Sequence, residues 1–272
     1  MSPYVGYATF ALAVVLYGAA TTLFYLEVVR GVSGGEDRPI APRLLGGGAA
    51  AHAAYVVVAS FVRHECPVHS IHFFMSMAAL VATGVYLVAR ARFRLHALGL
   101  VVAPLGLVTT LGTFFLGASV HYKELPASFI GLHVFVLLVG EALFLLACAA
   151  AVMYLVQERR LKDKKALLKG GLPPLESLDR AVHRFLVAGF PLLTMGVATG
   201  TVQAKMLEGG SADEVVRAVL GWVTWFLIAG VLLLRVLAGW RGRRAAYGTL
   251  AGFTCAFLLL MFYLVRPMLR GA

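Results

Sequence analysis

Residues 129–156 are FIGLHVFVLLVGEALFLLACAAAVMYLV, a stretch that contains one acidic residue, Glu141, and no Lys or Arg. A helix that rises about 1.5 Å per residue needs roughly 20 such residues to cross about 30 Å of hydrocarbon. Similar apolar blocks recur along the whole chain of 272 residues, of which 60% are apolar and only 14% charged. A soluble domain of this length would need more polar surface, so the sequence predicts an integral membrane protein.

The expected fold is all-α, a polytopic bundle of about eight transmembrane helices that forms a single membrane domain over residues 1–272. Open sheets are excluded because their unpaired edge amides are too costly in lipid, and a membrane barrel would show short alternating segments instead. The first block lacks a preceding basic stretch and a small-residue cleavage site, so we expect it to be retained. The predicted spans cover residues 4–29, 44–62, 71–89, 97–117, 129–156, 185–204, 216–238 and 246–265.

The distribution of positive charge predicts the orientation of the chain in the membrane. A net charge of +11 could suggest nucleic acid, but in a membrane protein the placement of Lys and Arg matters more than their sum. The connections after the first, third, fifth and seventh spans hold 18 of the 24 cations. The positive-inside rule therefore places both termini outside, and we expect no nucleic acid partner. The longest cytoplasmic connection, the basic loop 157–184, either lies solvated beside the lipid or docks a partner.

Histidines are the candidate ligands for haem iron, because imidazole suits iron and the chain has no thiolate cluster. His52 lies near the middle of the second span, among alanines that would let a flat ring or another helix approach closely. His133 lies just inside the outer end of the fifth span, and His72, a weaker candidate, begins the third span. The alternatives are a neutral His52 bonded to a neighbouring helix and an interfacial His133. For His96 and His183, at the cytoplasmic ends of spans, an interfacial position is expected.

Other polar residues give less specific signals. Glu141 is a buried acid to which no role is assigned, and the outer segment 64–72 combines three histidines with Glu65 and Cys66. That segment either binds a metal, lines an access route for haem or is a plain polar loop. Because no CxxC or CxxCH motif occurs, we expect no disulfide framework, no zinc site and no covalent haem. Hydrolase and nucleotide-binding motifs do not occur either, so we expect no catalytic residue and no enzyme activity.

A series of motifs follows Tyr154 and the basic run after it. They are LPPLESLDR at 172–180, GFPLLTMG at 189–196 with Gly200 one turn later, Trp222 to Trp225, and GWRGRRAA at 239–246 followed by Gly252-Phe253. In this order, and at predicted helix ends, the chain resembles the CcsA/CcmC-type cytochrome c assembly superfamily, especially its shorter HemX-like and YpjD-like branch. Earlier in the chain, His52 and the segment 131–134, GLHV, look like the histidine positions of that family.

The resemblance implies haem binding or haem passage across the membrane, with His52 and His133 as iron ligands. Three features of the fuller family members are absent from this chain. The tryptophan-rich WGxxWxWD segment is replaced by residues 205–214, the histidine of LHxR is replaced in the stretch 232–235, and no outer histidine follows the last span. The resemblance therefore implies a protein that binds haem and is poorly equipped to present it. Such a protein is closer to the HemX-like branch, which is linked to haem biosynthesis and glutamyl-tRNA reductase levels.

The expected function is non-covalent binding of b-type haem in cytochrome c assembly or haem handling, without catalysis. The expected location is the bacterial cytoplasmic (inner) membrane, and the expected partners are haem, membrane lipid and a second assembly or haem-biosynthesis protein. One alternative is a structural or regulatory membrane subunit without a cofactor. Another is a small transporter, for which the buried Glu141 would be relevant, although no inverted repeat favours it.

The orientation gives the first testable prediction. In a Cys66-free background, a cysteine introduced by Ser177→Cys should not react with a membrane-impermeant maleimide added to intact cells, because the positive-inside rule places this residue in the cytoplasm. It should react after the cells are opened. Labelling of intact cells at this position would contradict the predicted topology.

Overall fold

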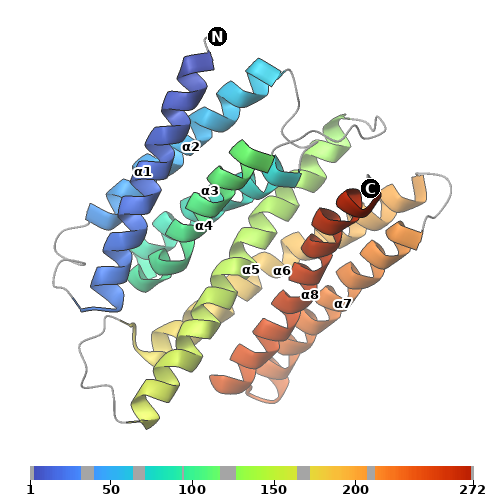
Figure 1. The fold of residues 1–272 in the computed structure, drawn as a ribbon. Coiled ribbons are helices and arrows are strands. Elements are labelled where there is room, and N and C mark those ends of the chain that lie inside the picture. The colour runs from blue at the N-terminus through green and yellow to red at the C-terminus, as the bar shows by residue number, and fades with distance from the viewer. Residues whose placement is uncertain are drawn as a thin grey trace. The chain divides into compact units, whose positions relative to one another are not determined.

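The structure is a computed structural model that describes residues 3–31, 40–63, 71–93, 95–116, 127–163, 172–206 and 212–270. Within these ranges the chain is helical apart from short turns, and no strand occurs there. The all-α fold expected from the sequence is confirmed. The helices are α1 (Pro3–Val28), α2 (Ile40–Arg63), α3 (Ile71–Phe93), α4 (Gly99–Leu116), α5 (Ala127–Lys162), α6 (Leu175–Met206), α7 (Ala212–Leu237) and α8 (Arg243–Arg270), with a 3₁₀ turn at His96–Leu98 (Figure 1).

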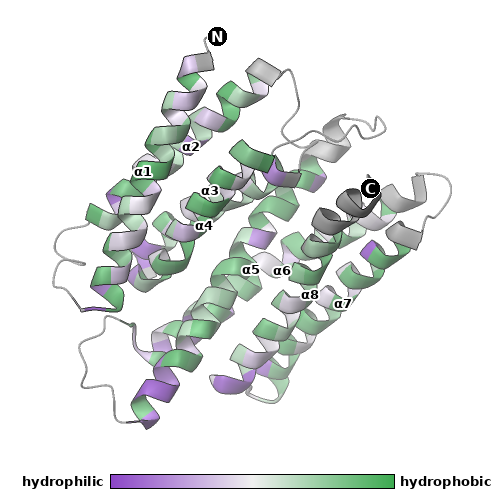
Figure 2. Ribbon diagram, in the orientation of Figure 1, coloured by the Kyte–Doolittle hydropathy of each residue, from purple (hydrophilic) through white to green (hydrophobic). Residues whose placement is uncertain are grey.

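Most of these helices are long and apolar enough to cross a membrane. In the described part of the chain, seven helices meet this condition, from Tyr4–Val28 in α1 to Val215–Leu237 in α7. Figure 2 shows that apolar residues run along most of each helix, while hydrophilic residues gather at helix ends such as the last turns of α5. The chain is therefore a multi-pass membrane protein. The eighth crossing by α8 and the outward position of both termini stay predictions.

The segment 157–184, expected to be a loop, is helical at both of its ends. Helix α5 continues to Lys162, where the side chain of Lys162 donates a hydrogen bond to Glu158 one turn earlier at 2.9 Å. Helix α6 begins at Leu175, directly after Pro174, and the carboxylate of Glu176 in its first turn favours a helix N-terminus. Hydropathy alone misses these ends, because the helices continue beyond the apolar blocks into polar sequence.

The contacts divide the helices into two compact units. The first holds α1 to α4 together with residues 157–174, and the second holds residues 125–156 of α5 together with α6 to α8. The single membrane domain expected from the sequence stays a prediction.

In the first unit, aromatic rings of α1 fill spaces left by glycines. Tyr17 and Phe24 are fully buried. A Cβ atom on Gly106 of α4 would overlap the ring of Tyr17, and one on Gly99 would overlap the ring of Phe24. A Cβ atom on Gly48 of α2 would lie 3.2 Å from the Tyr17 ring. These glycines therefore let α2 and α4 approach α1 closely, which is how helices gain packing energy in lipid.

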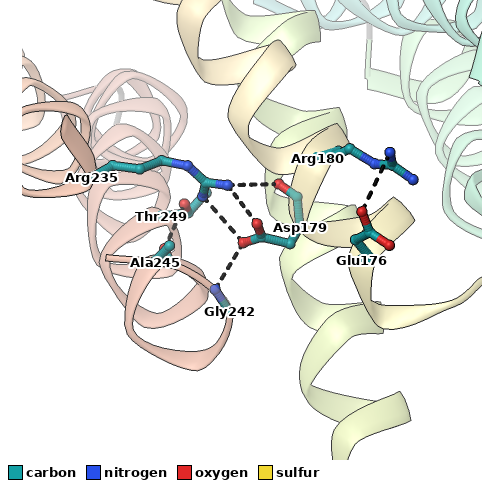
Figure 3. Close-up of polar contacts among 7 residues, drawn as sticks. All are labelled: Glu176, Asp179, Arg180, Arg235, Gly242, Ala245 and Thr249. Atoms are coloured by element: carbon teal, nitrogen blue, oxygen red, sulfur yellow. Dashed lines mark hydrogen bonds and ion pairs between the residues drawn. The ribbon is translucent and has the colours of Figure 1, made fainter. Parts of the chain in front are cut away.

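In the second unit, one carboxylate connects three elements (Figure 3). Asp179, in the second turn of α6, accepts hydrogen bonds from the guanidinium of Arg235 near the end of α7, with N···O distances of 2.5 and 3.2 Å. The amide of Gly242 donates to the same carboxylate at 2.8 Å. Gly242 and Gly239 adopt φ values of +61° and +64°, which glycine tolerates without strain. Asp179 thus joins the start of α6 to the end of α7 and to the turn before α8.

This ion pair gives a prediction about stability. Asp179→Ala should lower the free energy of unfolding by about 3–5 kcal/mol, because it leaves the buried Arg235 without its counter-charge. The Arg235 side chain is only 8% exposed. Unfolding in mixed detergent micelles at increasing dodecyl sulfate fraction measures this loss.

Glu176→Ala is the matched control for the ion-pair experiment. Glu176 forms an ion pair with Arg180 on the same helix, but its side chain is 79% exposed, so the loss should be within about 1 kcal/mol. Equal effects of the two variants would show that the contact of Asp179 with α7 and the turn contributes little.

Candidate functional site

His52 lies at the centre of a buried polar network in the first unit. Its ring is fully buried, with Nε2 3.0 Å from the hydroxyl of Ser76 on α3 and Nδ1 3.4 Å from the hydroxyl of Tyr17 on α1. The hydroxyl of Ser76 lies 2.5 Å from that of Thr113 on α4. Thr113 in turn donates to the backbone carbonyl of His72 at 2.9 Å. The network therefore includes side chains from α1, α2, α3 and α4.

The direction of these hydrogen bonds follows from the number of available protons. Each hydroxyl has one proton, and Thr113 directs its proton to a backbone carbonyl, which can only accept. Ser76 then donates to Thr113 or to a carbonyl, so its oxygen accepts the proton carried by His52 Nε2. This assignment of protons puts the lone pair of His52 on Nδ1, facing the hydroxyl of Tyr17. Both ring nitrogens thus have partners, and His52 could bind iron only after one of them leaves the hydroxyl of Tyr17 or of Ser76.

The other histidines of the first unit differ in their surroundings. His72, at the start of α3, is partly buried, and its ring makes no hydrogen bond with the residues the structure describes. His96 lies at a helix end as expected, but its side chain is only 15% exposed, and its Nε2 lies 2.7 Å from a carboxylate oxygen of Glu27. The guanidinium of Arg90 donates to its Nδ1 at 3.4 Å. Glu27 was not among the residues predicted from the sequence, although an acid within the first apolar block was a usable signal.

In the second unit, a row of glycines on α6 faces the side chains of α5. A Cβ atom on Gly189 would lie 3.3 Å from Leu143, one on Gly196 would lie 2.7 Å from Leu137, and one on Gly200 would lie 3.4 Å from Cε1 of His133. Two of these glycines belong to the motif GFPLLTMG at 189–196, and Gly200 follows that motif by one turn. Their lack of side chains lets α5 lie close to α6, and this places the His133 ring against α6.

Thr199 of α6 anchors the imidazole of His133. The hydroxyl oxygen of Thr199 lies 2.7 Å from Nδ1, and the His133 side chain is partly buried. Nε2 makes no hydrogen bond with any described residue. His133 therefore differs from His52 in having one ring nitrogen fixed and the other without a protein partner in the described structure.

The remaining candidate residues are not assembled into a site. Glu141 is partly buried in α5, makes no ion pair or hydrogen bond within the described ranges, and has no role that the geometry assigns. His183 on α6 has a buried Nδ1 without a partner among the described residues. In the part of the chain that the structure covers, no group of three or more His, Cys, Asp or Glu side chains could hold a metal ion. Residues 64–70, which hold most of the expected outer cluster, lie outside the described residues.

Comparisons with known proteins identify relatives of the chain. The cytochrome c biogenesis protein CcsA of Guillardia theta is 25% identical over 201 residues, which cover 66% of each protein. The inner membrane protein YpjD of Escherichia coli K12 is 29% identical over 143 residues, covering 53% of this chain and 52% of YpjD. The chain thus spans between about half and two thirds of the length of these two relatives. No solved structure matches it.

The fold and the buried histidines define a multi-pass helical membrane protein with imidazoles on its transmembrane helices. A family model described as cytochrome C assembly protein matches residues 49–272. The chain therefore belongs to the cytochrome c assembly protein family, and the resemblance stated from its motifs is confirmed. The match begins before His52, so it extends well beyond the C-terminal motifs on which the resemblance mainly depended.

The network around His52 gives a prediction about stability. His52→Ala should lower the free energy of unfolding by about 1–3 kcal/mol, because Ser76 and Tyr17 lose their buried partner. Ser60→Ala on the same helix is the control, since among the described residues Ser60 bonds only to the carbonyl of Val56 one turn earlier. Dodecyl sulfate titration in mixed micelles measures both variants. A loss no larger than that of the control would show that the network adds little to stability.

Proposed function

We propose that this protein binds haem non-covalently in the membrane and that Nε2 of His133 is an axial ligand of the iron. The observation that carries the proposal is the contact between His133 Nδ1 and the Thr199 hydroxyl at 2.7 Å, which fixes the ring by the nitrogen that would not bind iron. A histidine that binds a metal through one nitrogen usually donates the other N–H to a protein acceptor. Membership of the cytochrome c assembly family supports the choice of haem, the cofactor of every cytochrome c.

The surroundings of His133 fit a planar ring better than those of His52. His133 is partly buried at the outer part of α5. Gly200 of α6 faces Cε1 of its ring, and because glycine has no side chain, no Cβ atom crowds that edge of the imidazole. Bound haem would supply an iron atom with open axial positions. The protein would orient the imidazole, exclude water with the apolar side chains of α5 and α6, and hold the cofactor without the covalent attachment that CxxCH provides.

His52 and, more weakly, His72 stay proposals for further haem ligands. His52 binds iron only if its Nδ1 leaves the hydroxyl of Tyr17 or its Nε2 leaves Ser76. Either change would leave a buried hydroxyl with one partner fewer, at a cost of about 1–3 kcal/mol. His52 and His133 lie in different units, and we propose a separate haem position for each.

The proposal extends to location and partners. One relative is by its name an inner membrane protein of Escherichia coli, and we place this chain in the bacterial inner membrane on that basis. The protein acts by binding and not by catalysis, and it works with an assembly protein or an enzyme of haem biosynthesis. The basic residues at the end of α5 (Arg159, Arg160 and Lys162) are a suitable surface for such a partner or for acidic lipid headgroups.

A second candidate function is a regulatory membrane subunit without a cofactor. The closed network of His52 favours it, because the most deeply buried of the described histidines already has a protein partner at each ring nitrogen. In that case both buried histidines would serve only to connect helices.

Haem binding predicts a specific loss in one histidine variant. Protein purified from cells supplied with a haem precursor should show a Soret band, and His133→Ala should reduce its haem content at least about tenfold, because the iron loses an axial imidazole. Added imidazole should restore part of the spectrum. The pyridine haemochromogen assay measures the haem, and acidified acetone should extract it fully.

Two further variants complete this experiment. His183→Ala should leave the haem content unchanged, since His183 lies near the opposite end of α6 from Thr199. His52→Ala tests the proposed second position, where a loss of part of the haem is expected. Unchanged spectra and haem content in folded His133→Ala and His52→Ala would contradict haem ligation and favour the cofactor-free subunit.

A further inference from the structure

We infer that Thr199 is a positioning residue that keeps the proton of His133 on Nδ1 and thereby leaves the lone pair of Nε2 available to iron. The second half of this inference rests on the proposed haem binding, whereas the first half concerns the protein alone. Nothing in the sequence motifs points to Thr199, which lies between the two glycines that bring α6 close to α5.

The proton of the Thr199 hydroxyl has a single destination. Its oxygen lies 2.7 Å from the carbonyl oxygen of Met195 and 3.1 Å from that of Gly196. A carbonyl oxygen can only accept, and two oxygen atoms 2.7 Å apart attract each other only when one of them donates, so we assign the proton of the hydroxyl to these carbonyls. The same oxygen lies 2.7 Å from Nδ1 of His133, and with its proton already used it must accept there. Nδ1 of His133 therefore carries a proton, and in the neutral imidazole Nε2 then has a lone pair.

The same reasoning assigns the opposite tautomer to His52. There the proton is on Nε2 and is donated to Ser76, because the hydroxyls of Ser76 and Thr113 donate their own protons to other oxygen atoms. Hydroxyl groups thus set two buried histidines in opposite ways. His52 presents its lone pair to Tyr17, whereas His133 presents its lone pair to a position without a partner in the described structure.

The packing of α5 on α6 keeps Thr199 within reach of His133. Gly196 and Gly200 flank Thr199 on α6, and Cβ atoms there would lie 2.7 Å from Leu137 and 3.4 Å from His133. Larger residues would push the helices apart and lengthen the bond to Nδ1. In a site of low dielectric such a bond is strong, so its loss should change both the tautomer and the basicity of the ligand.

The first test measures the tautomer in protein without haem. Histidine ¹⁵N shifts report which ring nitrogen carries the proton, and the signal of His133 is identified by its loss in His133→Gln. Wild-type protein and Thr199→Ser should show Nε2 unprotonated, whereas Thr199→Val should move the proton to Nε2. Thr201→Val is the matched control, because Thr201 makes the same type of bond to the carbonyl of Val197 at 2.7 Å and has no bond to any described histidine.

The second test measures haem in the same four proteins. Thr199→Val should bind haem about 10- to 100-fold more weakly, which is the usual loss when the group that hydrogen-bonds to a metal-binding histidine is removed. The midpoint potential of the haem that remains should rise. Thr199→Ser and Thr201→Val should behave as wild type. An unchanged tautomer in Thr199→Val overturns the inference even if haem binds. If wild-type protein binds no haem, the proposed function fails while the tautomer result stands. A shifted tautomer with unchanged affinity and potential overturns the link to iron.

Discussion

The absence of water in the bilayer core is the constraint on which the rest of this structure depends. A polar group there must find its partner within the protein, so the backbone forms helices and most threonine hydroxyls of the spans bond to a carbonyl one turn earlier. Once a hydroxyl has used its proton in this way, its oxygen can only accept. The hydroxyls of α3, α4 and α6 therefore control which nitrogen of a neighbouring imidazole carries the proton.

Charged groups obey the same constraint at the ends of the spans. Asp179 and Arg235 are both largely buried and pair with each other, and the amide of Gly242 uses the remaining capacity of the carboxylate. Through the bond from the Gly242 amide, the carboxylate of Asp179 also connects two of the motifs on which the family resemblance depends, LPPLESLDR and GWRGRRAA. It also gives Arg235 a structural role in a stretch where the histidine of the fuller family members is replaced.

His52 and His133 lie in helix contacts of different kinds. His52 belongs to a network that joins four helices of one unit, its own included, and its removal is expected to weaken their packing. His133 lies on a two-helix contact lined by glycines, where only one of its nitrogens is used. This difference explains why we assign haem to His133 first, and why a variant of each histidine reports on a different property.

The sequence by itself determined the helical class, most of the spans and the family, because hydrophobic length and motif order are local properties of the chain. It identified His52 and His133 as candidate ligands, because a histidine within an apolar block can be recognised from the sequence alone. It did not find the ends of α5 and α6, which continue into polar sequence, nor the partners Ser76, Thr199 and Glu27. Only the tertiary structure decided those partners, since they lie on other helices and a hydrogen bond needs atoms within about 3 Å, which no spacing along the chain specifies.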